Sequence, residues 1–135
     1  MKVFISHASA DTWVARQIAA QIQARGAATF LDVEQIPIGD DFRERILDVE
    51  PDCDELLVLL TPWSARRPWV LFEISCFIHA RKRVVCILHG LTTEDAKGDP
   101  IIGELLPRET FVDINALDAY FEQVSRQIAA GQETR

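Results

Sequence analysis

The sequence contains few cysteines, and their spacing excludes the common cysteine-based scaffolds. Its three cysteines, Cys53, Cys76 and Cys86, are odd in number and include no Cys-x-x-Cys pair. Disulfide-stabilised domains and structural zinc sites normally need paired or closely spaced cysteines. We therefore expect buried free thiols and no metal site.

Long apolar segments are also missing. After Met1-Lys2 the chain enters Val3-Phe4-Ile5 directly, and no later apolar stretch has the length of a signal-peptide core or a membrane-spanning helix. We therefore expect a cytoplasmic protein with no membrane partner.

Positive charge is scarce too. The formal net charge is −7, and Lys and Arg gather only at Arg66-Arg67 and in the cluster Arg81-Lys82-Arg83. A nucleic-acid or anionic-membrane surface needs a larger basic patch. We therefore expect no nucleic-acid partner.

The sequence also lacks the common phosphate-binding and catalytic motifs. It has no Gly-x-Gly-x-x-Gly after its first strand and no Gly-x-x-x-x-Gly-Lys-Ser/Thr, which disfavours Rossmann and P-loop sites. A phospho-acceptor receiver domain would need acids where Ser6-His7 and Thr61 stand. His7 and His89 follow strands without a nucleophile motif, so a turn or hydrogen-bonding role is favoured over general-base catalysis.

What the sequence does contain is the pattern of one α/β domain. With 48% hydrophobic and 26% charged residues, the 135-residue chain has enough apolar side chains for one sizeable core. Strand-length apolar runs alternate with helical patterns or loops, which predicts a doubly wound, five-stranded parallel sheet with helices on both faces. The predicted strands are Lys2–Ser6, Ala27–Leu31, Glu55–Leu60, Arg83–Leu88 and Thr110–Ile114.

Helix signals set the outer limits of this domain. Asp11 is a candidate N-cap of the first helix, and Gly26 is its stop signal. The last helix begins near Leu117 and ends near Gly131. We expect residues 1–131 to form the single domain and residues 132–135 to be a frayed tail.

Ligands of such sheets bind beyond the carboxyl ends of the strands, where the winding reverses. The segments expected at that edge are Ser6–Ser9, Asp32–Asp41 and Thr61–Trp69. The helix predicted over Pro68–Lys82 follows the last of these. At about 100° per residue, it surrounds the carboxylate of Glu73 with apolar and thiol side chains, namely Trp69, Cys76, Phe77 and Ala80.

A carboxylate in an apolar setting needs a partner, a proton or a ligand. Here it is accompanied by aromatic and hydroxyl groups, without a metal-ligand cluster or a triad. Such a site suits a reaction in which positive charge develops on a sugar, because an anion stabilises an oxocarbenium-like transition state.

Three motifs in order resemble the Toll/interleukin-1 receptor (TIR) domain family, in particular its bacterial NAD-cleaving members. They are Val3-Phe4-Ile5-Ser6-His7 followed by Asp11, the loop from Phe30 to Gly39, and Trp69-x-x-x-Glu73. The resemblance implies a flavodoxin-like sheet of strand order 2-1-3-4-5. It also implies that NAD⁺ is a substrate rather than a cofactor and that Glu73 is the catalytic residue. The substrate-binding residues that it implies are Ser6, His7, Asp32, Phe42 and Trp69.

The implied reaction cleaves the bond between nicotinamide and ribose, giving nicotinamide and ADP-ribose or a cyclic ADP-ribose isomer. The sequence leaves hydrolysis and cyclisation open, and it leaves open whether Glu73 is a nucleophile or an electrostatic stabiliser.

By the same resemblance, the loop from Asp32 to Asp41 matches the family's BB loop, which mediates self-assembly. Permanent exposure of the apolar side chains at its tip to water would be unfavourable. We therefore expect assembly to bury the tip and to complete the NAD⁺ site. The alternative is that the tip folds back on its own domain. The assembly residues are Ile36, Pro37, Ile38 and Gly39, and a sensor or activator protein is a further expected partner.

Two other functions stay open at this point. One is a non-catalytic TIR adaptor that recruits proteins through the BB loop. The other is an enzyme similar to nucleoside deoxyribosyltransferases, which share the winding and a catalytic carboxylate but do not normally carry such a loop.

Overall fold

The computed structural model describes residues 1–31 and 42–133, apart from the side chains of Phe42 and Glu133. Within that part of the chain, five parallel strands form one sheet in the order β2-β1-β3-β4-β5. The strands are β1 (Lys2–Ser6), β2 (Ala28–Leu31), β3 (Glu55–Leu60), β4 (Arg83–Leu88) and β5 (Phe111–Asp113). The predicted fold class and strand order are confirmed.

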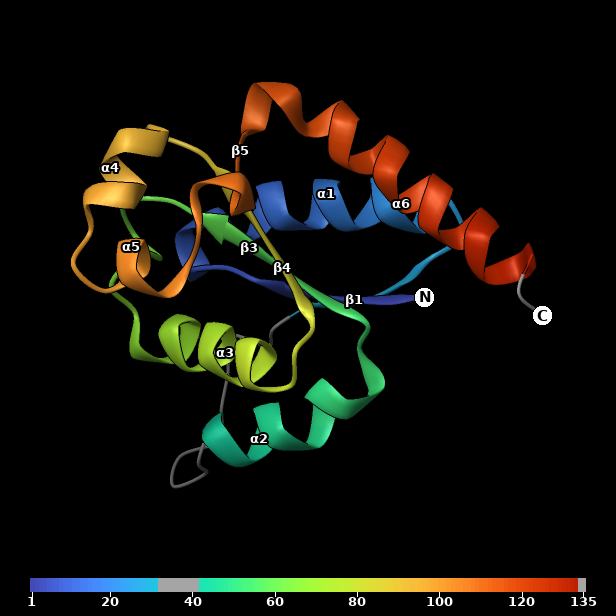
Figure 1. The fold of residues 1–135 in the computed structure, drawn as a ribbon, viewed down its shortest axis with the longest axis horizontal. Coiled ribbons are helices and arrows are strands. Elements are labelled where there is room, and N and C mark those ends of the chain that lie inside the picture. The colour runs from blue at the N-terminus through green and yellow to red at the C-terminus, as the bar shows by residue number, and fades with distance from the viewer. Residues whose placement is uncertain (32–41, 134–135) are drawn as a thin grey trace.

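Helices cover both faces of the sheet (Figure 1). On one face lie α1 (Thr12–Ala24) and α6 (Leu117–Glu133), and on the other lie α2 (Phe42–Val49) and α3 (Pro68–His79). The short helices α4 (Thr93–Gly98) and α5 (Ile102–Leu105) follow β4. Single 3₁₀ turns complete the described helical structure: η1 (Ser9–Asp11), η2 (Glu50–Asp52), η3 (Arg108–Thr110) and η4 (Ile114–Ala116).

β3 is the central strand, and all of its residues are buried. Its Leu57 pairs in register with Ile5 of β1 and with Val85 of β4. A parallel strand covered on both faces has no position that faces water, which explains why the sequence shows no polar alternation there.

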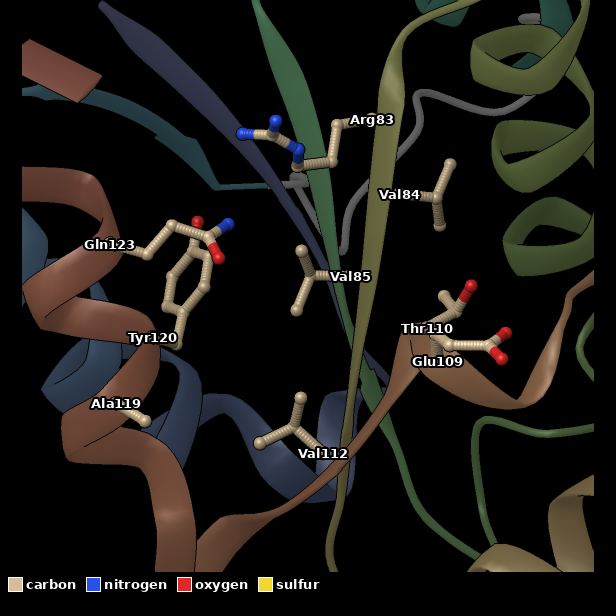
Figure 2. Close-up of a pocket in the computed structure, with 9 residues that line it drawn as sticks. All are labelled: Arg83, Val84, Val85, Glu109, Thr110, Val112, Ala119, Tyr120 and Gln123. Atoms are coloured by element: carbon tan, nitrogen blue, oxygen red, sulfur yellow. The ribbon is translucent and has the colours of Figure 1, made fainter. Parts of the chain in front are cut away.

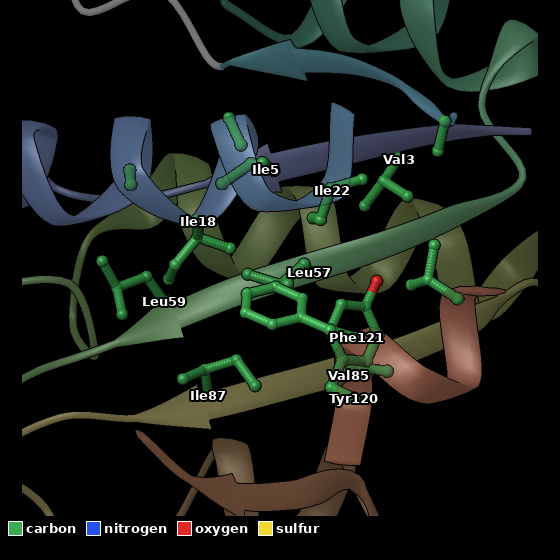
Figure 3. Packing of buried hydrophobic residues seen from close by; sticks show 14 residues of the cluster. Val3, Ile5, Ile18, Ile22, Leu57, Leu59, Val85, Ile87, Tyr120 and Phe121 are labelled. Carbon is green, nitrogen blue, oxygen red and sulfur yellow. The ribbon is translucent and has the colours of Figure 1, made fainter. Parts of the chain in front are cut away.

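A first apolar core attaches α1 and α6 to the sheet (Figure 3). Burying each large aliphatic or aromatic side chain in it contributes on the order of 1.5–3 kcal/mol. The core includes Ile18 and Ile22 of α1, Leu57 and Leu59 of β3, Val85 and Ile87 of β4, and Tyr120 and Phe121 of α6.

A second core attaches α3 to the opposite face. Val70, Ile74 and Phe77 of α3 are each 0% exposed and belong to it. The ring of Phe77 meets Phe4 of β1 edge-to-face, with centroids 5.6 Å apart. This aromatic contact places α3 against β1 as well as against its sequence neighbours β3 and β4.

The helix ends agree in part with the sequence signals. Gly26 follows α1 with a φ of +98°, in the region that favours glycine, and the predicted stop is confirmed. Asp11 holds the predicted N-cap position, but its side chain makes no capping hydrogen bond, so the predicted capping role is wrong. α6 continues past Gly131 to Glu133, and the division into domain and tail stays a prediction.

None of the described helices is both long and apolar enough to cross a membrane.

The three cysteines are free thiols, with Cys53 and Cys86 buried and Cys76 half-buried. Burial raises the pKa of each thiol, which keeps all three protonated at neutral pH. The predicted buried free thiols are therefore confirmed for Cys53 and Cys86, while Cys76 is partly accessible.

The amino end of the sheet holds a buried carboxylate, Glu55, which is 2% exposed. The Tyr120 hydroxyl donates a hydrogen bond to Glu55 Oε2 at 2.6 Å, and Arg83 Nη1 lies 3.7 Å from Oε1. Burial raises the pKa of Glu55 although Tyr120 and Arg83 both lower it. A cavity at this edge is lined by residues that include Met1, Glu55, Gln127 and Gly131, so the first strand begins close to the end of α6.

We expect Glu55 to make folding stability depend on pH. Its pKa in the folded protein lies above the ordinary value of 4.5, so the folded state binds this proton more tightly than the unfolded state. The resulting stabilisation is present below the unfolded-state pKa and is lost as pH rises through the folded-state pKa. In thermal unfolding between about pH 4 and pH 8, the melting temperature of wild type should therefore fall relative to that of Glu55→Gln. The exposed Glu109→Gln is the control, and parallel curves for wild type and Glu55→Gln would contradict this assignment.

Candidate functional site

The winding of the sheet reverses at β1, which has β2 on one side and β3 on the other. Beyond the carboxyl ends of β1 and β3, one loop leads into η1 and α1 and another leads into α3. This is the edge at which doubly wound sheets bind ligands.

Glu73 is fully buried on α3, with 0% of its surface exposed. The helix begins at Pro68 and follows Arg67, which holds the N-cap position. Ser75 and His79 of the same helix are exposed, so they lie on another side of it. The predicted orientation of Glu73 toward the apolar side is confirmed.

Ser6 and His7 stand at the end of β1 and are 0% and 4% exposed. Because Phe4 belongs to the core beneath α3, Ser6, two residues along the strand, faces the same helix. Among the described residues, no group makes a hydrogen bond to the Ser6 hydroxyl.

The Phe4–Phe77 contact fixes how far along the strand direction Ser6 and Glu73 lie, and the two residues lie at about the same position. α3 runs antiparallel to β1, because it returns from the carboxyl end of β3 to the amino end of β4. Moving from Phe77 to Glu73 ascends about 6 Å along the helix, and moving from Phe4 to Ser6 ascends about 6.6 Å along the strand. Ser6 and Glu73 thus lie on the facing surfaces of β1 and α3. Each is about 6 Å nearer the ligand-binding edge than the Phe4–Phe77 pair.

Trp69 lies one helical turn before Glu73, half-buried against the core beneath α3. The guanidinium carbon of Arg67 stands 5.5 Å from the centre of its ring. Both contacts favour a packing role for Trp69. Phe42 begins α2, but its side chain is not described, and Asp32 and the assembly residues Ile36, Pro37, Ile38 and Gly39 lie outside the described residues.

Sequence reasoning missed a buried polar network at this edge. The Thr61 hydroxyl donates to Asp11 Oδ2 at 2.6 Å, joining the loop after β3 to the loop after β1. Ser64 Oγ donates to the Leu59 carbonyl at 2.8 Å and accepts from the Thr61 amide at 2.9 Å. Asp11, Thr61 and Ser64 are all at most 5% exposed. Their only signal in the sequence is that polar residues follow two buried strands.

Glu73 does not line any of three cavities found among the described residues. One of about 300 Å³ lies beside β4 and β5 and is bounded by α6, with Tyr120, Gln123 and Val85 on one side of β4 and Val84 on the other (Figure 2). Another, of about 390 Å³, lies between the loop after β3 and the α4–α5 segment. In the described part of the chain, no group of three His, Cys, Asp or Glu side chains is arranged to hold a metal ion.

Comparison with known families decides the identity of this fold. A family model for the TIR domain matches residues 3–128. The chain belongs to the TIR domain family. A search of curated proteins gives no match to this TIR domain.

Two solved structures are similar to this TIR domain. The TIR domain of the Toll-related receptor TRR-2 from Hydra magnipapillata is 18% identical with a TM-score of 0.65, covering 94% of this chain and 97% of that one. The TIR domains of the activated Roq1 resistosome, which directly recognises the pathogen effector XopQ, are 15% identical with a TM-score of 0.56, covering 93% of this chain and 81% of that one. At these identities the two structures support the fold alone.

Ser64→Ala should destabilise the TIR domain by about 1–3 kcal/mol, because it leaves a buried carbonyl and a buried amide without their side-chain partner. Urea unfolding followed by circular dichroism measures this loss. The control is Ser75→Ala, since the exposed Ser75 hydroxyl donates to the Leu71 carbonyl of its own helix. Equal stabilities for the two variants would contradict a structural role of the Ser64 network.

Proposed function

We propose that this TIR domain is an NAD⁺ glycohydrolase or cyclase in which Glu73 is the catalytic residue. The observation that carries the proposal is the complete burial of the Glu73 side chain on α3, the helix that follows the loop beyond the carboxyl end of β3. Glutamates are almost never fully buried unless they have a specific partner.

One carboxylate can suffice for this chemistry. Cleavage of the bond between C1′ of the ribose and N1 of the nicotinamide moves the bonding electrons to the pyridinium nitrogen, and nicotinamide leaves as a neutral molecule. Positive charge then resides on the ribose, where a carboxylate in a water-poor environment stabilises it more strongly than in bulk solvent. Water attack at C1′ gives ADP-ribose and a proton, whereas attack by a group of the same molecule gives a cyclic isomer and a proton.

Each residue of the proposed site is assigned a role in this reaction. We assign Glu73 to the ribose hydroxyls and to the cationic transition state, and we assign Ser6 and His7 to the wall formed by the first loop. Trp69 supports the helix rather than the substrate. Asp32 and Phe42 complete the proposed substrate-binding set.

Self-assembly is part of the proposal. A carboxylate with no exposed surface reaches a dinucleotide only after the surrounding elements move, so we propose that assembly through Ile36, Pro37, Ile38 and Gly39 opens and completes the site. Membership of the TIR family, whose BB loop this segment resembles, supports this view. A cytoplasmic sensor or activator protein is the expected trigger.

Glu73→Gln should lower nicotinamide release about 10²–10³-fold, because it removes the stabilising charge while keeping the side-chain size. The measurement is incubation with NAD⁺ at low and high protein concentration, followed by chromatography and mass spectrometry of both products. Glu122→Gln on the exposed surface of α6 is the matched control. Turnover by Glu73→Gln at the wild-type rate would refute the assignment.

Ile36→Asp or Ile38→Asp should reduce both assembly and nicotinamide release, since a charge at the apolar tip opposes its burial between copies. Sedimentation velocity and the nicotinamide assay are run on the same samples. Asp40→Asn, which adds no charge to the tip, is the control. A variant that stays monomeric and fully active would remove assembly from the proposal.

A second candidate function is protein binding without catalysis. The observation that favours it is the exposure of two large aromatic side chains, Trp13 at 72% and Trp63 at 57%. Nicotinamide release from wild type selects the enzyme. Its absence at every concentration and with crowding, together with concentration-dependent association, selects the binding module.

A further inference from the structure

Asp11 and Thr61 form the one described side-chain hydrogen bond that directly links the two loops of the proposed site. The Thr61 hydroxyl and Asp11 Oδ2 are 2.6 Å apart, and the residues are 0% and 5% exposed. They are 50 positions apart in the sequence. A short hydrogen bond to a carboxylate is stronger than a neutral one, and burial removes competing water.

Asp11 makes this contact instead of capping its own helix. It holds the N-cap position of α1, where an aspartate ordinarily accepts from amides of the first turn, but it makes no such bond. Its amide donates to the Ala8 carbonyl at 2.9 Å, closing the turn that follows Ser6 and His7. The carboxylate is therefore fixed to the first loop and directed at the other loop.

Thr61 is linked in turn to the start of α3 by successive hydrogen bonds. Its hydroxyl accepts from the Ser64 amide at 3.2 Å, the Arg67 amide donates to the Ser64 carbonyl at 3.1 Å, and the Val70 amide donates to the Arg67 carbonyl at 3.1 Å. Val70 lies one turn before Glu73 on the same helix. These bonds run from the first loop, through Asp11 and Thr61, to the helix that carries the carboxylate.

We propose that the Asp11–Thr61 hydrogen bond is a positioning contact of the NAD⁺ site, which sets the first loop relative to the first turn of α3 and thereby Ser6 and His7 relative to Glu73. The inference rests on the proposed function. Asp11 and Thr61 act through the residues they hold and need not touch the substrate.

The expected kinetic effect follows from geometry. Misplacing a catalytic group by about 1 Å costs on the order of 10²-fold in rate. Thr61→Val keeps the shape of the side chain and removes the hydroxyl, so we expect kcat for nicotinamide release to fall at least tenfold. Thr61→Ser retains the hydroxyl and should restore kcat to within about threefold of wild type.

A matched control separates positioning from stability. Tyr120→Phe removes another buried hydroxyl-to-carboxylate hydrogen bond of 2.6 Å, at the amino edge of the sheet. It is expected to change the melting temperature but not kcat. If Thr61→Val does not fold alone, Asp11→Asn/Thr61→Val, which removes the Asp11 carboxyl group together with its hydroxyl partner, takes its place.

A second readout needs no catalysis. Hydrogen exchange followed by NMR should show the amides of Ser64, Arg67 and Val70 exchanging at least tenfold faster in Thr61→Val than in wild type, while Tyr120→Phe leaves them unchanged. Thr61→Ser should exchange like wild type.

The outcomes are distinct. A tenfold fall of kcat in Thr61→Val, with rescue by Thr61→Ser and no fall in Tyr120→Phe, supports the positioning contact. Equal kcat for Thr61→Val and wild type overturns it, as does an equal fall in Tyr120→Phe. If wild type releases no nicotinamide, the proposed function fails, and hydrogen exchange alone then tests the positioning contact. Unchanged exchange of the three amides in Thr61→Val overturns the contact. Faster exchange confined to that variant supports it.

Discussion

The packing of Phe77 on Phe4 is the contact on which the arrangement of the proposed site depends. It holds α3 across β1, a strand that is not its neighbour in the sequence, and so brings the surface of the helix that carries Glu73 over the end of β1. α3 also packs against β3, β4 and α2. The catalytic proposal therefore depends on an apolar contact that itself performs no chemistry.

Two buried carboxylates mark opposite ends of the same sheet, and each accepts a hydroxyl hydrogen bond of 2.6 Å. Glu55 receives its bond from Tyr120 and attaches α6 to the start of β3, while Asp11 receives its bond from Thr61 and joins the loops beyond β1 and β3. A buried charge is costly unless it is paired, so each bond specifies one arrangement of the elements it joins. We infer that the first specifies the fold and the second the site.

Much of this could be predicted from the sequence because the strongest signals are local. The uninterrupted apolar runs predicted β3 and β4 to the residue, and the helical period placed Glu73 inside. Asp11 was misjudged because an aspartate before a helix predicts a cap, and only the fold shows that a threonine 50 positions away takes its carboxylate. The facing of Ser6 and Glu73 was also beyond local reasoning, because it arises from the antiparallel packing of two elements that meet only in the folded chain. The short helices α4 and α5 lack the repeated apolar period that made the longer helices predictable.

The start of β1 and the end of α6 lie together at the amino edge of the sheet, and the proposed site lies at the opposite edge (Figure 1). A domain or tag joined at either end would therefore be tethered on the far side of the molecule. Such a tether can concentrate several copies of the TIR domain while leaving the surface that carries Trp63 and the start of α3 accessible. A receptor, a scaffold or an engineered dimeriser attached at the amino edge of the sheet can therefore raise the local concentration of TIR domains without covering the proposed site at the carboxyl edge.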